Sequence, residues 1–260
     1  MERKILDHFR NVGEKVEKVV RSEPVESEKD KDVGMGADGT PTKCIDLKAE
    51  ETAIEYFKNN LDHSILSEEE GIVEQEGAGF IVMDPVDGTR NSLLDIPFYC
   101  ISLAFTPSDL SEVKVGYVRN LHTGTEYHAI EGEGSYKEGE RLSPKSKSGD
   151  ENTFSVYLGE RAVPESFEVA STPRRVRSLG SAALEICMVA EGTLDLYYHR
   201  TPGQRRSLRL IDIAAGALIL REVGGEVYNK DLERLNMDID PSERKDVIAI
   251  YDEGVKEELP

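Results

Sequence analysis

Residues 80–91 place the strongest constraint on how this chain can fold. The first four, Phe-Ile-Val-Met, have the length and β-branched content of a buried strand, and the following proline predicts that this strand stops at Asp84. Two carboxylates, Asp84 and Asp87, would then lie where a central strand ends. Residues 88–94 could begin a short helix whose free N–H groups attract an anion. Cation ligands beside an anion site are the features of metal-dependent phosphoryl transfer.

The N-terminal half has the mixed pattern of an α+β fold. Helical and strand-type patterns are both present before residue 99, with helices expected over 2–21 and 46–58 and strands over 64–66 and 80–83. From residue 99 to 136, β-rich runs are separated by short spacers containing Pro or Gly, which is typical of an antiparallel meander.

A glycine-rich stretch at residues 34–41 formally contains the G-x-G-x-x-G pattern of dinucleotide-binding loops. That pattern requires a strand before it and a helix directly after it, whereas here a charged run precedes it and Thr-Pro follows. We therefore interpret the stretch as a flexible loop rather than as a dinucleotide site.

Strands and helices alternate in the C-terminal half, which is typical of an α/β domain. The expected elements are strands over 153–158 and 176–179, a helix over 181–191, a strand over 193–199, a helix over 210–223, and strands over 226–228 and 247–250. Residues 143–151 have the Ser-, Lys-, Pro- and Gly-rich composition of a linker. The sequence thus predicts an N-terminal domain over residues 1–148 and a C-terminal domain over residues 149–260.

Acidic residues outside residues 80–91 have both a structural and a functional interpretation. Glu68 and Glu69 follow a short apolar strand, where consecutive glutamates are usually a solvated turn. Asp46 stands at the start of a helix, where capping would explain it. Asp212 lies in the first turn of a helix that is otherwise apolar, so its carboxylate needs a cation or strong donors. Capping the helix or binding a metal would each meet that need.

Net charge and cysteine content limit the partners. Lys and Arg total 32 against 51 Asp and Glu, a net charge of 32 − 51 = −19, which disfavours nucleic acid and anionic membranes as partners. A phosphorylated substrate would also be repelled, unless metal ions or a few arginines bind it locally. The three cysteines have no C-x-x-C spacing, and no apolar run approaches 18 residues. We therefore expect a soluble cytoplasmic protein.

Three ordered motifs resemble those of the inositol monophosphatase family, a magnesium-dependent, lithium-sensitive superfamily that also contains fructose-1,6-bisphosphatases. They are Glu68-Glu69, Asp-Pro-Val-Asp-Gly-Thr at 84–89 and Asp-Ile-Ala-Ala-Gly at 212–216. The resemblance covers nearly the whole chain and implies a layered αβαβα fold. Residues 34–42 and 96–99 are similar to archaeal members, many of which hydrolyse both fructose 1,6-bisphosphate and inositol 1-phosphate.

The resemblance implies a site for two or three Mg²⁺ ions. Its ligands would be Glu68, Asp84, the Val86 carbonyl, Asp87 and Asp212, with Asp38 completing a weaker third metal site when its loop closes. Oxygen donors suit a hard cation, and the five histidines are scattered along the chain and give no zinc cluster.

The implied reaction is in-line attack on phosphorus by a metal-activated water. Thr89, oriented by Asp46, would receive or relay a proton of this water, and Glu69 would assist from outside the ligand set. The backbone N–H groups of Gly88 and Thr89 would bind the phosphoryl oxygens, beside Asp87.

Sugar recognition is implied at two further places. Gly180, Ser181 and Ala182 match family positions whose backbone lies near the sugar hydroxyls. Many members carry an acidic residue some positions before the last aspartate, whereas this chain has an Arg-rich stretch at 199–206. Arg177 and the three arginines of this stretch, Arg200, Arg205 and Arg206, could clamp the second phosphate of a bisphosphate or could be solvated surface residues.

Two rival functions remain open. One is a phosphatase of 3′-phosphoadenosine 5′-phosphate or of another sugar monophosphate. The other is a catalytically silent, metal-binding homologue, against which the joint presence of Asp46, Asp84, Asp87, Thr89 and the other acidic residues argues. A homodimer is expected from the family resemblance.

Overall fold

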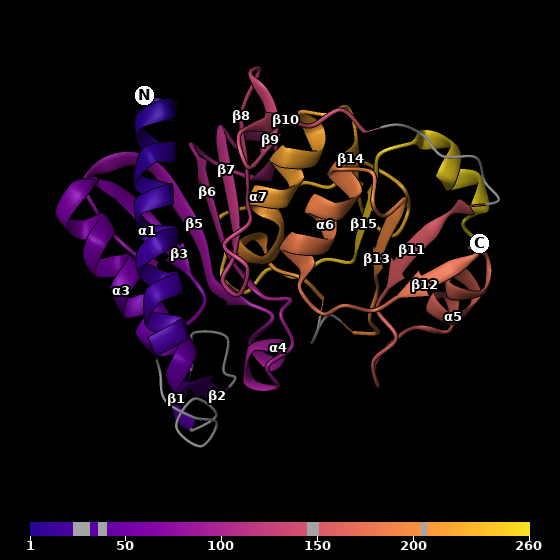
Figure 1. The fold of residues 1–260 in the computed structure, drawn as a ribbon, viewed down its shortest axis with the longest axis horizontal. Coiled ribbons are helices and arrows are strands. Elements are labelled where there is room, and N and C mark those ends of the chain that lie inside the picture. Colours follow the sequence, from indigo (N-terminus) through magenta and orange to yellow (C-terminus); the bar gives the residue numbers. More distant parts are fainter. Residues whose placement is uncertain (23–31, 36–40, 145–150, 204–206) are drawn as a thin grey trace.

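Helices and sheets alternate in five layers (Figure 1). The computed structural model describes residues 1–22, 32–35, 41–144, 151–203 and 207–260. From left to right in Figure 1 the layers are helices α1 (Glu2–Ser22) and α3 (Cys44–Asn60), an eight-stranded sheet, helices α6 (Ala182–Ala190) and α7 (Leu210–Arg221), a five-stranded sheet, and helix α5 (Pro164–Ser171). The expected αβαβα fold is confirmed.

The eight-stranded sheet has the order β10-β9-β8-β7-β6-β5-β3-β4. Its neighbours pair antiparallel except β3 and β5, which are parallel. The predicted meander forms β6 to β9. The strands are β3 (His63–Ser67), β4 (Gly71–Val73), β5 (Gly77–Asp87), β6 (Cys100–Thr106), β7 (Val115–Asn120), β8 (Glu126–Ile130), β9 (Gly134–Lys137) and β10 (Glu140–Arg141), and a 3₁₀ turn, η1 (Leu110–Glu112), precedes β7.

Strand β5 is longer than the sequence predicts. The expected stop at Asp84 is wrong, because β5 continues through Pro85 to Asp87, and its pairing with β6 shifts register between Asp84 and Asp87. Proline cannot donate a ladder hydrogen bond, and this irregularity accommodates it. The expected short helix is present as α4 (Thr89–Leu93), preceded by Gly88 in the left-handed region with φ 93°.

Successive residues of β5 face opposite sides of the sheet. Ile81 and Met83 pack in a core with α1 and α3, whereas Val82 packs with α6 and α7 on the other side. Helix α7 approaches β7 so closely that a Cβ on Gly116 would lie 2.7 Å from the Ala215 carbonyl oxygen. Because α7 lies between two sheets, its apolar residues are buried on every side, as expected for a helix without a polar face.

The five-stranded sheet has the order β12-β11-β13-β15-β14. Strand β11 is parallel to β12 and β13, and β15 is antiparallel to β13 and β14. Its outer face forms a third core with α5 and the 3₁₀ segment η3 (Glu253–Glu258). The strands are β11 (Thr153–Val156), β12 (Arg175–Arg177), β13 (Leu196–His199), β14 (Glu226–Tyr228) and β15 (Val247–Ile250).

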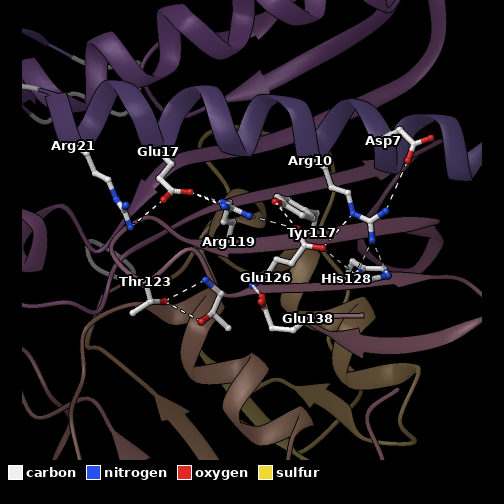
Figure 2. Close-up of polar contacts among 11 residues, drawn as sticks. Asp7, Arg10, Glu17, Arg21, Tyr117, Arg119, Thr123, Glu126, His128 and Glu138 are labelled. Atoms are coloured by element: carbon white, nitrogen blue, oxygen red, sulfur yellow. Dashed lines mark hydrogen bonds and ion pairs between the residues drawn. The ribbon is translucent and has the colours of Figure 1, made fainter. Parts of the chain in front are cut away.

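Ion pairs and hydrogen bonds fasten α1 to the first sheet (Figure 2). Arg119 on β7 lies 2.7 Å from the Glu17 carboxylate on α1, and Arg10 on α1 lies 3.2 Å from Glu126 on β8. The Tyr117 hydroxyl donates to Glu126 at 3.2 Å. Helix α1 packs in turn against α3, the helix that carries Asp46.

The glycine-rich stretch is only partly described. Its ends belong to an antiparallel hairpin of β1 (Asp32–Met35) and β2 (Pro41–Lys43), so the expected loop is wrong there. Residues 36–40, with Asp38, lie outside the described residues. So does the predicted domain boundary at 148, and the two-domain division stays a prediction. No described helix is long and apolar enough to span a membrane.

Candidate active site

Three buried carboxylates and the half-buried Glu68 come from three remote segments, and we call these four the acidic cluster. Glu68 follows β3, Asp84 and Asp87 lie in the last part of β5, and Asp212 lies in the first turn of α7. Burial raises the pKa of Asp84 well above its ordinary value, and the charges of Glu68, Asp87 and Asp212 raise it further. The Arg209 guanidinium contacts both Glu68 and Asp212, so the segments that carry these two residues adjoin, and their charges act on Asp84.

A local turn at the end of β5 orients Asp84. Its Oδ1 accepts a hydrogen bond from the Val86 N–H at 3.0 Å, two residues along the chain. The turn directs the Val86 carbonyl toward α4, where it accepts the Thr89 hydroxyl at 3.1 Å. The carboxylate and the carbonyl on either side of Pro85 are thus held in place by local bonds.

The N-terminal end of α6 holds Asp87. Its Oδ2 accepts the Ser181 hydroxyl at 2.7 Å and the Ala183 N–H at 2.8 Å, and the Cys100 sulfur lies 3.7 Å away. Burial raises the pKa of Asp87 to about 7, although the bond from Ser181 opposes that rise. A cation near Asp87 would favour the ionised form.

Thr89 and Asp46 form the pair that the sequence predicts. The Thr89 hydroxyl lies 3.1 Å from Asp46 Oδ1 and 3.1 Å from the Val86 carbonyl oxygen. Asp46 lies in the first turn of α3 and is 5% exposed. Burial raises its pKa well above the ordinary value, and the charge of Glu68 adds to this effect.

The backbone turn at residues 179–181 is held by Glu185, which is 3% exposed on α6. Its carboxylate accepts N–H groups of Leu179, Gly180 and Ser181 at 3.2, 3.1 and 3.2 Å. Gly180 also adjoins α4, since a Cβ on Gly88 would lie 3.1 Å from the Gly180 carbonyl oxygen. The predicted phosphate-binding and sugar-binding segments are therefore neighbours, with Ala182 beginning α6 beside them.

Replacing Glu185 with Ala is expected to lower the free energy of unfolding by about 2–4 kcal/mol, because one buried and two part-buried N–H groups and the buried Ser155 hydroxyl lose their acceptor. Urea unfolding followed by circular dichroism measures the change. Glu185→Gln keeps an acceptor oxygen and is expected to lose less. An Ala variant as stable as the wild type would show that the carboxylate does not hold this turn.

Arg209 lies directly against the acidic cluster. Its guanidinium Nη2 is 2.5 Å from Glu68 Oε1 and 3.3 Å from Asp212 Oδ1. The Arg209 backbone N–H also donates to Asp212 Oδ2 at 2.6 Å. Asp212 therefore serves the capping role that was one of its two interpretations, and the metal role stays a prediction.

The donors of the acidic cluster are oxygen atoms, which a hard cation prefers. Their side chains, however, are not arranged as a metal-binding group. Among the described residues, no group of three or more His, Cys, Asp or Glu side chains is placed to hold a metal ion. Arg209 instead pairs with two of the predicted ligands, Glu68 and Asp212. Asp84 and Asp87 are 3% and 9% exposed, so further positive charge at the cluster would offset a large desolvation cost.

Other predicted residues lie apart from the cluster. Arg177 is exposed on β12 and donates to the Val176 carbonyl, and Arg200 pairs with Asp246 beside a cavity of about 510 Å³. Within the described part of the chain, neither contacts a carboxylate of the cluster. Glu69 donates its backbone N–H to Glu50 at 3.1 Å. Arg205 and Arg206 fall outside the described residues.

Sequence reasoning missed three residues that shape the site: Arg209, Glu185 and Asn91. The Asn91 amide bridges the Phe98 and Leu179 carbonyls, both at 2.7 Å, and so joins α4 to the 179–181 turn. A signal was available for two of them, because a charge within an apolar stretch, as in Leu-Arg-Leu-Ile and Ala-Leu-Glu-Ile, requires a buried partner. Asn91 carried no such signal.

Comparison with known proteins gives consistent matches. The model of the inositol monophosphatase family matches residues 4–249. A fructose-1,6-bisphosphatase/inositol-1-monophosphatase of Archaeoglobus fulgidus is 38% identical over 95% of this chain and 94% of its own length. A bifunctional NADP phosphatase/NAD kinase of Methanococcus maripaludis is 34% identical over 94% of this chain, which spans 47% of that protein. A solved inositol monophosphatase–fructose 1,6-bisphosphatase superposes with a TM-score of 0.85 at 27% identity, covering 97% and 96% of the two chains.

Proposed function

The chain belongs to the inositol monophosphatase family, and from that premise we propose that it is an Mg²⁺-dependent phosphatase of small sugar phosphates, hydrolysing fructose 1,6-bisphosphate and inositol 1-phosphate. One observation carries the proposal: the Thr89 hydroxyl, bonded to Asp46, stands beside the turn that joins Asp84 to Asp87. A hydroxyl with a buried carboxylate partner next to oxygen donors for a cation suits hydrolysis of a phosphate ester.

Mg²⁺ would be held by the acidic cluster and the Val86 carbonyl, two or three ions in all, with Asp38 as a further ligand. When bound, Mg²⁺ would supply positive charge to the phosphoryl oxygens and acidify the attacking water. The selection of Mg²⁺ over zinc is supported by donors that are oxygen atoms, since soft or nitrogen ligands favour zinc.

Thr89 is proposed to move the proton. Its hydroxyl donates to Asp46, so its oxygen lone pairs can accept a proton from the attacking water while its own proton passes to Asp46. The raised pKa of Asp46, caused first by burial and then by Glu68, makes its carboxylate a better proton acceptor than an exposed aspartate. Glu69 would assist by supporting the turn that presents Glu68.

Backbone groups of Gly88 and Thr89 are proposed to bind the phosphoryl oxygens. Helix α4 has five residues, so its dipole is small and direct N–H contacts would contribute most of the binding. Gly180, Ser181 and Ala182 adjoin this segment and would contact the sugar. Arg177 and Arg200 would have to reach a second phosphate from outside the cluster.

A nucleotide 2′- or 3′-phosphate is the second candidate substrate. The relative named as a bifunctional NADP phosphatase/NAD kinase favours it, because it matches 94% of this chain. NADP⁺ and 3′-phosphoadenosine 5′-phosphate both present a monoester on a ribose ring. The two candidates differ in the group beyond the reacting phosphate, not in the chemistry at the cluster.

We expect the protein to release phosphate from fructose 1,6-bisphosphate and inositol 1-phosphate only with Mg²⁺ present, and to be inhibited by Li⁺. A phosphate-release panel over these two esters, NADP⁺ and 3′-phosphoadenosine 5′-phosphate, each with Mg²⁺ or EDTA, measures this. The Asp84→Asn variant controls for contaminating phosphatase. Phosphate release that persists in EDTA would contradict the metal requirement. Faster release from NADP⁺ or 3′-phosphoadenosine 5′-phosphate than from the sugar phosphates would support the second candidate substrate instead of the first.

We propose that the enzyme acts in the cytoplasm as a homodimer. The three cysteines are free, as in a reducing compartment. Leu94 and Ile96, just after α4, are large exposed apolar residues that a partner subunit could cover. Light scattering coupled to gel filtration would give the oligomeric state.

A further inference from the structure

Arg209 joins two of the three chain segments that form the acidic cluster. Its guanidinium contacts Glu68, which follows β3, and Asp212, in the first turn of α7, at 2.5 and 3.3 Å. The arginine is 8% exposed, so these contacts are shielded from water. Its charge also acts on Asp84, where it opposes the repulsion from the neighbouring carboxylates.

The backbone and the side chain of Arg209 contact different oxygen atoms of Asp212 and have different roles. The backbone N–H donates to Asp212 Oδ2 and so caps the helix, whatever side chain stands at position 209. The side chain donates to Oδ1 and to Glu68. Capping therefore does not explain why a buried cation stands here, since desolvating a guanidinium is costly and an apolar side chain would leave the cap intact.

We propose that the Arg209 guanidinium takes the place of a metal ion in the metal-free enzyme, holding Glu68 and Asp212 in position, and withdraws from at least one of them when the metal binds. The inference rests on the proposed metal-dependent function. A metal ion bound to the same carboxylates would repel the guanidinium and draw electron density from the oxygens that accept its hydrogen bonds, so the short Arg209 contacts weaken when the metal binds.

Two opposite effects follow for the metal-free and metal-loaded protein. Without metal, Arg209 offsets repulsion among buried carboxylates and therefore stabilises the fold. With metal, breaking its contacts subtracts from the binding free energy, so Arg209 weakens the affinity. A purely structural ion pair would stabilise both forms alike and would leave metal affinity unchanged.

The test uses Mn²⁺ without substrate, with free Mn²⁺ followed by electron paramagnetic resonance. Arg209→Gln is expected to bind Mn²⁺ about tenfold more tightly than the wild type, the effect of removing one charge-assisted contact that binding must break. The Tm of Arg209→Gln is expected to be lower than that of the wild type in EDTA, and this difference is expected to be smaller with saturating Mn²⁺. Arg209→Lys, which keeps a cation, is expected to lie between the two.

Arg221→Gln is the matched control. Arg221 is the last residue of α7, its side chain is 15% exposed, and it pairs with Glu226 at 2.8 Å, away from the acidic cluster. We expect this variant to lose Tm equally in EDTA and Mn²⁺ and to keep the wild-type affinity. That pattern in Arg209→Gln would overturn the inference.

The outcomes distinguish the inference from the function on which it rests. A wild-type protein that binds no Mn²⁺ would overturn the proposed function and the inference with it, whereas equal affinities in wild type and Arg209→Gln would overturn the inference alone. If Arg209→Gln does not fold, a crystal structure of the wild type with Mn²⁺ decides. Retention of both contacts, to Glu68 and to Asp212, would overturn the proposal, and loss of either would support it.

Discussion

Replacing Asp87 with Asn is expected to abolish phosphate release and, at pH 8, to stabilise the metal-free protein. Asn keeps an oxygen that can accept from Ser181 and Ala183 but has no charge to hold a metal. We expect kcat with Mg²⁺ to fall by at least about 10³-fold, because both the cation and the phosphate would be held less well. The gain in stability and the loss of activity have the same cause, which is removal of the buried negative charge of Asp87.

The stability effect depends on pH. Burial raises the pKa of Asp87 from 3.8 to about 7, so between these values the folded protein binds a proton that the unfolded chain has released. The stability contributed by this group therefore falls as pH rises through that range, and the loss is complete above pH 7. The difference corresponds to about 4 kcal/mol as an upper limit. Asp87→Asn removes this penalty at pH 8 and changes little near pH 4.

Urea unfolding in EDTA at pH 4.5 and pH 8 measures this effect, with Asp95→Asn as the control. Asp95 is exposed on the segment after α4 and lies outside the acidic cluster. Stabilisation of Asp87→Asn only at pH 8 is the expected result. Equal effects at both pH values would refute the account of the buried charge, and near-normal turnover with Mg²⁺ would remove Asp87 from the metal site.

Replacing Thr89 with Ala is expected to lower kcat by about 10²–10⁴-fold and to change KM much less, which is the range for losing a positioned proton-transfer group. The hydroxyl is held 3.1 Å from both Asp46 Oδ1 and the Val86 carbonyl oxygen, so its orientation is set before substrate arrives. Thr89→Ser keeps the hydroxyl and should keep most activity. Steady-state kinetics on the preferred ester measure both variants.

The partner of Thr89 allows a stricter test. If Thr89 and Asp46 act as one unit, Asp46→Asn should lower kcat comparably, and the double variant should be little worse than either single variant. Thr52→Ala is a matched control, since the Thr52 hydroxyl on α3 donates to the Lys48 carbonyl of its own helix at 2.7 Å. Additive losses, or a Ser variant as slow as Ala, would show that Thr89 acts through packing rather than through its hydroxyl.

Much of the fold follows from local patterns. Helices α1, α3, α6 and α7 and the β6–β9 meander lie close to where periodicity predicts them, because each must bury an apolar face or stripe. The end of β5 does not, since proline tolerance depends on whether the neighbouring strand bulges there. Helix α5 and the β1–β2 hairpin were also unforeseen, being short elements whose stability comes from what they pack or pair against.

The sequence by itself determined the family and, through the family resemblance, the layered architecture, and it predicted the set of acidic residues, because motifs and their spacing are properties of the linear chain. Only the tertiary structure decided that the Arg209 guanidinium lies against two of those carboxylates, Glu68 and Asp212. Arg209 shares a short segment with Asp212, yet its contact with Glu68, 141 positions away, arises only when the end of β3 meets the start of α7. Charges in a buried site interact through distance and desolvation, and neither quantity exists until the chain has folded.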